Sequence, residues 1–447
     1  CHRHRRKAQS LRQRMSKATL EHWLQRLESL HPSEIELGLE RVSAVAGRME
    51  LLRPEQPVVT VAGTNGKGST VAVLEALLVA DGKKTGSLTS PHFLRFNERI
   101  RLAGAEAADA EIIAAFEAVD AAREHTSLTY FEYTTLAALW LFREWQVDVM
   151  ILEVGLGGRL DAVNIIDPTI AIITSIALDH QDWLGDTRAA IALEKAGIVR
   201  PGIAVLVADR DPPGELLQRV AEIGAGPVLR LGHEFDADES GPVVRARLSR
   251  PGGGSSELPL PDLAGVLPQN AGAALQAALL LGVEVGSGQL QEALSGMRLT
   301  GRRQSLQVAG VDYILDVAHN PAAVDKLLEK MAITPCKGKT IALFSVMKDK
   351  DIKTMVNAAA EVFDAWFLAD QPGNARAARA ADVADLLRAA GQTMISVSKN
   401  IKQALRRAQS LTGSGDRLVI FGSFHTVAGV LPALEKDRRK HVVGAPT

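Results

Sequence analysis

Short, continuous runs of hydrophobic residues alternate along the chain with longer stretches of helical spacing. The first runs are VVTVA, VDVMILEV, TIAIITSI and IAVLVA, and segments of helical pattern lie between them. Continuous runs are typical of strands whose two faces are both buried, whereas half-exposed strands alternate. The pattern therefore predicts an α/β fold, with a parallel sheet covered by helices on both faces.

The pattern changes twice in the second half of the chain. The segment GPVVRARLSRPGGGSSELPLPDL alternates and contains turn residues, which predicts a hairpin. A helical stretch and the basic segment SGMRLTGRRQSLQV follow, and a second α/β series then begins at YILDVAHNP. We expect a first domain at residues 15–298 and a smaller α/β domain at residues 299–447.

The first residues have a different character from the rest. The segment CHRHRRKAQSLRQRM has six Lys and Arg residues before Met15 and no acidic residue. It lacks the apolar run of a secretory signal, and its basic character is only weakly similar to a transit peptide. Ser16 precedes a helical pattern and is a suitable N-cap. We expect residues 1–14 to be a basic extension without fixed structure.

Composition limits the classes of function. A chain of 447 residues exceeds the size of one core, and 46% hydrophobic with 23% charged residues is ordinary for a globular protein. The net charge of −1 gives no case for binding nucleic acid or a membrane surface. No apolar run reaches the ~18 residues of a membrane span. Cys1 and Cys336 suit a reducing compartment, so we expect a cytoplasmic protein. We also expect a monomer whose partners are small molecules.

The segment VVTVAGTNGKGSTVAVLEALL has the order strand, Gly-rich turn, helix. In that order, backbone N–H groups and a helix N-terminus bind phosphate. The usual spacing G-x-x-x-x-G-K-[ST] is not met, because Val61 stands at the first glycine position and Gly68 at the hydroxyl position. The alternative is an ordinary turn in which Lys67 is solvated.

Polar residues follow several of the predicted strands. Glu153 ends the run VDVMIL, His180 follows TIAIITSI, and Ser90 follows another possible strand. Ligands of open α/β sheets bind beyond the carboxyl ends of the strands, and Mg²⁺ takes few protein ligands. With Lys67, these residues predict a magnesium–nucleotide site. Taken alone, Glu153 is equally suited to pair with Arg159 or to cap a helix, and a histidine such as His180 is more often a surface or structural residue.

Ten segments together resemble the folylpolyglutamate synthase/dihydrofolate synthase family of the Mur ligase superfamily. In chain order they are GTNGKGST, TSPHFLRFNERI, YFEYTTLAAL, EVGLGGRLDAVN, LDHQDWLG, EKAGIVRPG, LPQNAGAAL, GRRQ, DVAHNPAA and GSFHTVAG. The resemblance runs from roughly Ser16 to Val430. It implies a P-loop, Mur-ligase-type ATP-binding domain followed by a smaller Rossmann-like α/β domain. The shortened loop with Gly68 is similar to the phosphate loop of that superfamily.

The resemblance implies an ATP-dependent ligase of folate biosynthesis. Such an enzyme joins L-glutamate to dihydropteroate, forming dihydrofolate, and to tetrahydrofolate or its polyglutamates through γ-linkages. The substrate carboxylate first becomes an acyl phosphate, which the glutamate amine then attacks. The implied cofactors are ATP and two Mg²⁺ ions, and a monovalent cation stays open.

The resemblance also assigns site residues by their match to the family motifs. The implied ATP-binding residues are Thr64, Asn65, Gly66, Lys67, Gly68, Ser69, Asn270, Arg302, Asp316 and His319. The implied metal ligands are Ser90, Glu153, His180 and Lys195, the last as a carbamate, and the implied catalytic residues are Lys67, Glu153, His180 and Lys195. The implied pterin-binding residues are Glu36, Leu37, Gly38, Thr129, Tyr130, Phe131, Glu132 and Asp161. Without the resemblance, Lys195 is a helix-end cation, Arg302 a solvated linker charge and Phe131 a core residue.

Two departures and three alternatives remain. Val317 stands where the family commonly has Gly, and Thr300 where it has Pro. A monofunctional folylpolyglutamate synthase is one alternative, although chain length and TSPHFLRFNERI favour the bifunctional form. A cell-wall Mur ligase needs a further domain, and only 62 residues precede Gly63. A nucleotide-dependent P-loop switch protein is the alternative from another class, and the chain has no N-K-x-D-type motif.

Overall fold

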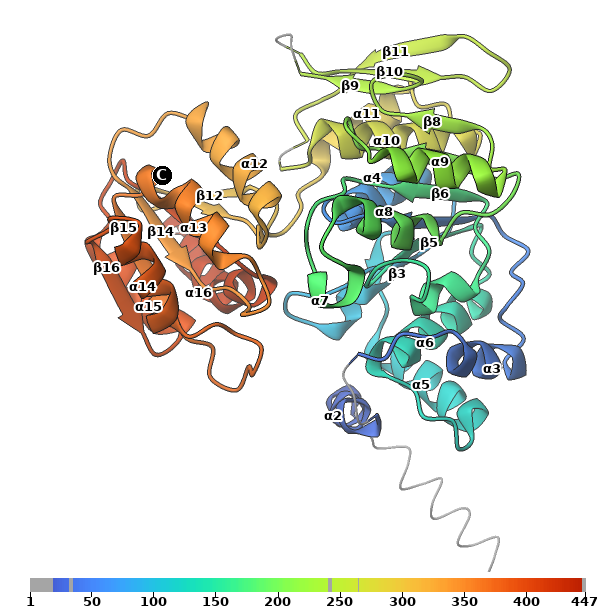
Figure 1. The fold of residues 1–447 in the computed structure, drawn as a ribbon, viewed down its shortest axis with the longest axis horizontal. Helices are drawn as coiled ribbons and strands as arrows, with labels where there is room; N and C mark the ends of the chain where they lie inside the picture. Colours follow the sequence, from blue (N-terminus) through green and yellow to red (C-terminus); the bar gives the residue numbers. More distant parts are fainter. Residues whose placement is uncertain (1–18, 32–34, 240–242, 264, 444–447) are drawn as a thin grey trace, which may run out of the picture. The chain divides into compact units, whose positions relative to one another are not determined.

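The computed structural model describes residues 19–31, 35–239, 243–263 and 265–443, so the predictions for residues 1–14 and for a cap at Ser16 lie outside it. Contacts divide the chain into two compact units (Figure 1). The first comprises the described residues of Cys1–Ile176, Arg188–Pro261 and Pro268–Leu294, and the second comprises those of Ala177–Thr187, Asp262–Leu267 and Ser295–Thr447. The junction of independently folding domains at residues 298–299 stays a prediction.

The first unit is built on an eight-stranded sheet with the order β4-β3-β2-β5-β1-β6-β7-β8. Strands β2, β5, β1, β6, β7 and β8 are parallel, while β3 and β4 extend the sheet in antiparallel pairings. The central strands β1 and β5 are buried at every residue, as continuous apolar runs predict. The strands are β1 Val58–Ala62, β2 Thr85–Leu88, β3 Ile100–Leu102, β4 Ala105–Glu106, β5 Val149–Glu153, β6 Ile170–Ile173, β7 Ala204–Val207 and β8 Val228–Arg230.

Helix α4 (Lys67–Ala80), which follows β1, packs against α10 (Pro268–Leu280). Figure 1 shows α10 next to a separate sheet of β9 (Asp236–Asp238), β10 (Arg245–Ser249) and β11 (Ser255–Pro259), whose last two strands form the predicted hairpin. The other elements of this unit are α2 Leu20–Leu30, α3 Glu40–Arg48, η1 Phe96–Arg99, α5 Asp109–Arg123, α6 Tyr130–Glu144, η2 Ala162–Ile165, α8 Arg188–Ala196 and α9 Gly214–Ile223. Helix α11 (Gly288–Gly296) contains the point, between Leu294 and Ser295, at which the chain passes from the first unit to the second.

The second unit has a six-stranded sheet with the order β12-β13-β17-β14-β15-β16. Five strands are parallel, and β12 pairs with β13 in the antiparallel sense. The strands are β12 Gln304–Val308, β13 Val311–Leu315, β14 Thr340–Phe344, β15 Ala365–Ala369, β16 Ile395–Ser398 and β17 Arg417–Phe421. The helices are α7 Gln181–Leu184, α12 Pro321–Ala332, α13 Ile352–Ala359, η3 Ala360–Val362, α14 Ala380–Ala389, α15 Ile401–Leu411 and α16 Phe424–Val443. Two α/β units confirm the predicted fold class.

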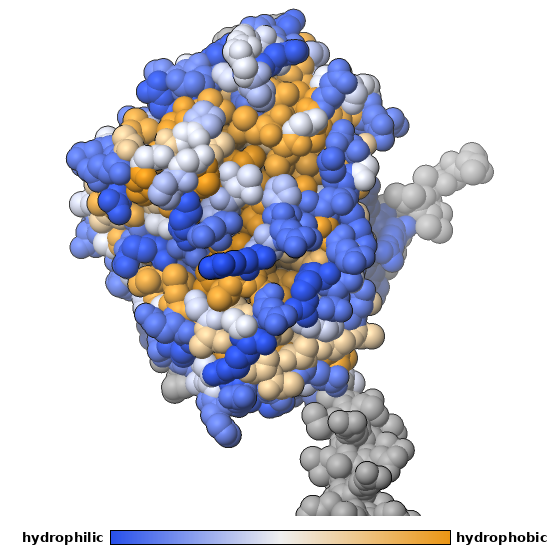
Figure 2. Space-filling view, turned by 90° about the vertical axis from the view of Figure 1, so that its right-hand side faces the viewer, coloured by the Kyte–Doolittle hydropathy of each residue, from blue (hydrophilic) through white to orange (hydrophobic). Residues whose placement is uncertain are grey.

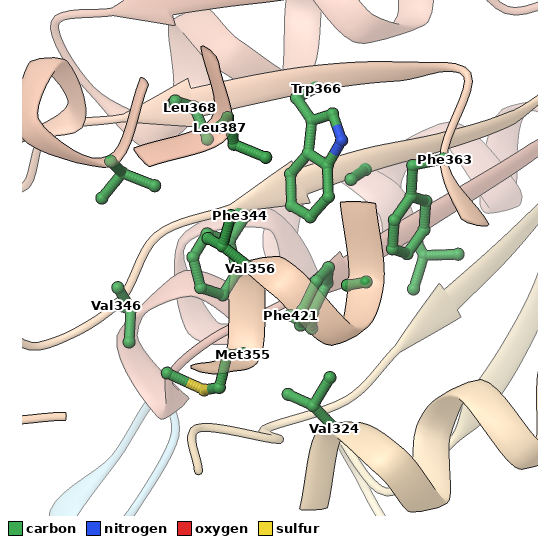
Figure 3. Packing of buried hydrophobic residues seen from close by; sticks show 14 of the residues in the cluster. Val324, Phe344, Val346, Met355, Val356, Phe363, Trp366, Leu368, Leu387 and Phe421 are labelled. Atoms are coloured by element: carbon green, nitrogen blue, oxygen red, sulfur yellow. The ribbon is translucent and has the colours of Figure 1, made fainter. Parts of the chain in front are cut away.

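Aromatic residues fill the core of the second unit between its sheet and helices (Figure 3). The ring centroids of Phe344 and Phe421 are 4.7 Å apart, and those of Phe363 and Trp366 are 5.0 Å apart. Val324 of α12 and Met355 of α13 belong to the same cluster. Interlocking rings of this kind fix the helices on the sheet.

The surface of the first unit carries both kinds of side chain. On the face seen in Figure 2, hydrophilic residues surround and interrupt the hydrophobic areas. Among the described residues, no helix is both long enough and apolar enough to span a membrane.

Candidate functional site

The loop after β1 is held by the residues that follow the neighbouring strand β6. Thr64 N donates to the carbonyl oxygen of Ser175 at 2.7 Å, and Ser175 Oγ donates to that of Asn65 at 3.2 Å. A Cβ atom at position 63 would lie 1.7 Å from Thr174 Oγ1, so only Gly63 fits this approach. The loop therefore has a fixed shape that depends on its neighbour in the sheet.

Gly66 ends this loop and is the N-cap of α4. Its φ of 92° is left-handed, and a Cβ there would lie 2.5 Å from Asn270 Oδ1. The structure thus brings Asn270, an implied ATP-binding residue of α10, to the phosphate loop. The side chain of Ser69 is buried within the first turn of α4. Backbone N–H groups at such a helix start are an anion-binding arrangement.

Lys67 is the first residue of α4 and lies over the loop. Its Nζ donates to the carbonyl oxygens of Gly63 at 3.0 Å and Thr64 at 3.2 Å. Its positive charge also reaches Asp161. An ammonium group held over a phosphate loop in this way is placed to contact the phosphates of a nucleotide.

Asp161 is a buried carboxyl in the loop after β5. Burial raises its pKa to about 6, against hydrogen bonds from the backbone N–H groups of Leu156 and Val163 and the charge of Lys67. The side chain caps η2 through Val163 N at 3.0 Å. Its hydrogen bonds fix its direction, and its raised pKa means that it takes up a proton at a higher pH than an ordinary carboxyl.

Four adjacent strands, β2, β5, β1 and β6, carry the predicted polar segments after their carboxyl ends. In the register of the sheet, Val61 of β1 lies opposite Glu153 of β5. Ser90 N donates to Glu153 Oε2 at 2.9 Å, and Glu153 is 4% exposed. The structure thus brings Ser90 and Glu153 together beside the phosphate loop. This edge, where the strand order changes direction, is the usual ligand-binding place of an open α/β sheet.

Arg99 is a neighbour of Glu153 that sequence reasoning missed, although it lies in the motif FNERI. Burial lowers the pKa of Arg99, while the charges of Tyr130 and Glu153 oppose this shift. Its guanidinium lies 5.4 Å from the ring centroid of Tyr130. The alternative partner for Glu153, Arg159, pairs with Glu194 at 2.9 Å.

Lys195 lies at the end of α8 and is only 3% exposed. The loop after Glu153 packs closely on its backbone: Arg159 N donates to the Glu194 carbonyl oxygen at 2.9 Å, and a Cβ at Gly158 would lie 2.7 Å from that oxygen. Lys195 does lie at a helix end, as the alternative requires, but its burial shows that it is not a surface lysine. A buried ammonium is costly unless it is paired or neutralised.

Glu153 and Ser90 suit a divalent cation such as Mg²⁺, which prefers oxygen ligands. Within the described ranges, no group of three or more His, Cys, Asp and Glu side chains forms a metal cluster. Mg²⁺ commonly takes one or two carboxylates and completes its coordination with water and phosphate oxygens. One carboxylate beside a phosphate loop therefore fits this ion.

His180 belongs to Ala177–Thr187, which contacts assign to the second unit, so the structure does not place it with Glu153. Burial lowers its pKa to about 4, with Asp179 opposing and Lys350 and His319 adding to the shift. A neutral imidazole is the form that binds metals.

Asp179 holds this segment through a buried polar cluster that sequence reasoning missed. Lys350 Nζ donates to Asp179 Oδ1 at 2.6 Å, and Asn320 Nδ2 donates to Oδ2 at 3.2 Å. His319 Nε2 lies 3.4 Å from Oδ2. Burial would raise the pKa of Asp179, but the hydrogen bond of His319 and the charges of His319, Lys350 and His180 outweigh it and lower the pKa.

Arg302, Asp316 and His319 lie together at the carboxyl end of β13. The carboxylate of Asp316 accepts hydrogen bonds from Ala318 N at 2.7 Å and Arg303 N at 2.9 Å. Burial raises the pKa of Asp316, and the charge of Arg302 opposes the shift. Phe424, which sequence reasoning missed, lies under Arg302, 5.0 Å from ring centroid to guanidinium carbon.

The two departures from the family pattern lie in the same region. Val317 is buried, and its N–H donates to the carbonyl oxygen of Gly301 at 2.9 Å. Thr300 precedes that glycine and replaces no polar group of the site. Both departures therefore affect backbone shape next to Arg302 and leave its chemistry in place.

The implied pterin-binding residues of the first unit start with the first turn of α6. Thr129 and Glu132 form a capping box, with Glu132 N to Thr129 Oγ1 at 3.2 Å and Thr129 N to Glu132 Oε2 at 2.7 Å. A Cβ at Gly155 would lie 2.8 Å from Phe131 Cζ, so Phe131 packs on the loop that leads to Asp161. Phe131 and Tyr130 are half-buried, not core residues.

Glu36 lies before α3 with the half-buried residues Leu37 and Gly38. Its carboxylate forms ion pairs with Arg41 and with His31, the latter at 3.2 Å. The fold therefore places each implied pterin segment in the first unit, before α3, at the start of α6 or in the loop after β5.

Comparison with known proteins gives consistent results over most of the chain. Residues 61–250 match the family model of the Mur ligase middle domain, and residues 301–424 match that of the Mur ligase glutamate ligase domain. The chain is 41% identical over 420 residues to a dihydrofolate synthase/folylpolyglutamate synthase of Escherichia coli (strain K12), spanning 93% of this chain and 96% of that protein.

Solved structures agree with these matches. The fold is similar to E. coli FolC in complex with DHPP and ADP, with a TM-score of 0.86 and 40% identity over 94% of this chain and 99% of that one. It is also similar to a bifunctional folylpolyglutamate synthase/dihydrofolate synthase with Mn, AMPPNP and L-glutamate bound, with a TM-score of 0.84 and 40% identity over 94% of this chain and 98% of that one. The chain therefore belongs to the dihydrofolate synthase/folylpolyglutamate synthase family of Mur ligases.

Proposed function

We propose that this chain uses ATP to join L-glutamate to dihydropteroate, and to tetrahydrofolate and its γ-linked polyglutamates. The observation that carries the proposal is the phosphate loop with Lys67, which lies beside Glu153 and Ser90 at the carboxyl ends of adjacent parallel strands. The names of the relatives and the ligands of the solved structures support this activity over a P-loop switch.

The reaction has two steps. A carboxylate oxygen of the acceptor attacks the γ-phosphorus of ATP, and the bond from that phosphorus to the oxygen that bridges the β- and γ-phosphates breaks. The products are ADP and an acyl phosphate. The amine of L-glutamate then attacks the acyl carbon, loses a proton and expels phosphate, which completes the amide. Positioning and neutralisation of charge supply most of the acceleration in such transfers.

Residues of both units have proposed roles toward ATP. Lys67 and the loop N–H groups of Thr64, Asn65, Gly66, Gly68 and Ser69 bind the phosphates, with Asn270 beside them. Arg302, Asp316 and His319 of the second unit bind the nucleotide as well. Mg²⁺, when bound, neutralises phosphate charge. Its proposed ligands are Ser90, Glu153, His180 and Lys195.

Lys195 has a proposed role as a carbamate. The residue is 3% exposed, and a lysine amine in its neutral form can add CO₂ and lose a proton. The resulting anion has oxygen atoms suited to Mg²⁺. We further propose two Mg²⁺ ions and a monomeric, cytoplasmic enzyme, and leave a monovalent cation open.

The pterin acid has its own proposed set of residues. They are Glu36, Leu37, Gly38, Thr129, Tyr130, Phe131, Glu132 and Asp161. Phe131 offers an aromatic surface to the pterin ring, and the carboxylate of Asp161 can accept hydrogen bonds.

Turnover with each acceptor tests the proposal. Purified chain is given ATP, Mg²⁺, L-glutamate and either dihydropteroate or tetrahydrofolate, and ADP and product mass are measured. We expect continuous ADP formation only when acceptor and glutamate are both present, and loss of activity by a factor of about 100 or more in Lys67→Met. Lys326→Met, which removes a surface lysine paired with Glu329, is the matched control.

Each other outcome has a distinct meaning. ATP hydrolysis that needs neither acceptor nor glutamate would support a switch protein and contradict the proposal. Activity with tetrahydrofolate but not with dihydropteroate would support a monofunctional folylpolyglutamate synthase. Full ligation by Lys67→Met would remove the phosphate-loop assignment.

A further inference from the structure

Arg41, in the first turn of α3, contacts two segments that are far apart in sequence. Its Nη1 forms an ion pair with the carboxylate of Glu36, and its Nη2 donates to the Glu36 carbonyl oxygen at 3.1 Å. The same Nη2 donates to Glu132 Oε1, also at 3.1 Å. One guanidinium thus connects the segment before α3 with the start of α6, 91 residues later in the chain.

Glu132 links Arg41 to the first turn of α6. While Oε1 accepts from Arg41, Oε2 accepts from the backbone N–H of Thr129 at 2.7 Å. The side chain of Glu132 is 4% exposed, so its charge has little access to water. The direction of Thr129 and of the residues that follow it therefore depends on a carboxylate that Arg41 holds.

The charges at this point require a cation. Glu36 and Glu132 are both acidic, and Arg41 is the residue that contacts both. His31 pairs with Glu36 as well, but no contact joins it to Glu132 among the described ion pairs. Without Arg41, the buried carboxylate of Glu132 would lose its cation, and Glu36, whose side chain is 45% exposed, would keep its pair with His31 but lose its link to Glu132.

We infer that Arg41 is a positioning residue for the pterin acid, because it holds Glu36–Gly38 and Thr129–Glu132 in one arrangement. The inference rests on the proposed function, which assigns these two segments to the pterin acid. Arg41 acts through Glu36 and Glu132 and has no assigned contact with ATP. A planar guanidinium suits this role, since it donates to two acceptors in fixed directions, which an ammonium does not.

The simpler interpretation is an ion pair that only stabilises the fold, and α3 provides a comparison for it. Arg48, at the other end of the same helix, donates to the Ala122 carbonyl oxygen at 3.1 Å and to Thr126 Oγ1 at 3.2 Å. It ties α3 to the end of α5 and touches neither pterin segment in the described contacts. Replacement of Arg48 therefore measures how much stability and ligand affinity change when α3 is held less firmly but both pterin segments keep their contacts.

Binding affinities of the full chain separate the two interpretations. Dihydropteroate and a non-hydrolysable ATP analogue are titrated separately into wild type, Arg41→Met, Arg41→Lys and Arg48→Met, and thermal midpoints are recorded. We expect Arg41→Met to weaken dihydropteroate binding about tenfold, as loss of a charged hydrogen bond implies, with ATP-analogue affinity within about twofold. Arg41→Lys should lie between wild type and Arg41→Met. Arg48→Met should lower the thermal midpoint and leave dihydropteroate affinity within about twofold.

Two results would overturn the inference while leaving the proposed function standing. One is unchanged dihydropteroate affinity in Arg41→Met, and the other is an equal loss of affinity for both ligands. If Arg41→Met does not fold, Arg41→Lys decides by the same criteria, since it keeps the charge and most of the packing. Wild type that binds the ATP analogue but not dihydropteroate would instead overturn the proposed function.

Discussion

Three buried ionisable residues lie around the loop that follows β5 in the first unit. Glu153 is 4% exposed, Lys195 is 3% exposed and Asp161 is 3% exposed. Ionisable groups taken out of water are costly, so they persist where a partner, a ligand or a changed protonation state offsets the cost. Each of these residues lies on β5, on the loop after it, or on α8, which packs against that loop. Their shared location around one loop supports a functional site there.

Asp161 predicts how stability depends on pH. Its pKa is about 6 in the folded chain against an ordinary value of 3.8, so the folded state binds more protons than the unfolded state between these values. The free energy of unfolding should therefore fall as pH rises from about 4 to about 6, by roughly 3 kcal/mol from this group. Denaturant unfolding without metal or nucleotide, compared with Asp161→Asn, isolates the contribution. Parallel pH profiles of the two proteins would contradict it.

Lys195 predicts a removable modification. We expect Lys195→Ala to lose ligation by a factor of about 100 or more, with partial recovery when a small carboxylate is added. The intact wild-type protein should carry the mass of one CO₂ on Lys195, lost in acid. Full activity of Lys195→Ala would overturn the carbamate proposal. Lys326→Ala again serves as the surface control.

At the scale of elements, sequence pattern predicted the strands well. The runs VVTVA, VDVMILEV, TIAIITSI and IAVLVA contain β1, β5, β6 and β7, because buried parallel strands are hydrophobic on both faces. The hairpin of β10 and β11 followed from alternation and its Gly-rich turn. The positions of these strands can be predicted from local sequence, because the burial of a strand determines which of its own residues are hydrophobic.

Contacts between distant elements could not be predicted in the same way. Lys350 and Asp179 are 171 residues apart, and neither the turn MKDKD nor the loop LDHQ signals a partner. Asn270 approaches Gly66 because α10 packs on α4, and Arg41 reaches Glu132 because α3 lies near α6. Such pairs depend on the angles at which helices and strands pack, and the hydrophobic periodicity of one element does not contain these angles. Family resemblance supplied Asn270, whereas Asp179, Lys350, Arg41 and Phe424 needed the structure.

The aromatic core of the second unit predicts a large effect of truncation. Phe421 of β17 is 1% exposed and packs against Phe344, Phe363 and Trp366. Phe421→Ala should lower the free energy of unfolding of this unit by about 3–5 kcal/mol, because a cavity remains on the sheet. Leu411→Ala, at a residue 62% exposed, should change it by less than about 0.5 kcal/mol. Equal effects in denaturant unfolding would contradict the assigned core.

At the scale of the whole molecule, the proposed ATP-binding residues are divided between the two units. Lys67 and Asn270 belong to the first, and Arg302 and Asp316 belong to the second. The pterin segments, in contrast, all belong to the first unit. The account therefore makes ATP binding a property of the complete chain and assigns both acceptors to one set of residues.

A shared acceptor site predicts competition. Dihydropteroate should inhibit glutamylation of tetrahydrofolate competitively, with an inhibition constant equal to its own KM when it turns over slowly. Steady-state rates with both acceptors present measure this directly. Inhibition that more tetrahydrofolate does not relieve would show that the acceptors bind at separate places.

Transfer of a labelled oxygen atom tests the central claim, that the chain activates the acceptor carboxylate with ATP. Dihydropteroate labelled with oxygen-18 in its carboxylate is converted with ATP and L-glutamate, and the released phosphate is analysed by mass spectrometry. In an acyl phosphate, the oxygen that attacked the γ-phosphorus leaves with the phosphate when the amine displaces it. The account predicts one labelled oxygen atom in each phosphate released with product. Phosphate without label, formed together with dihydrofolate, would contradict it.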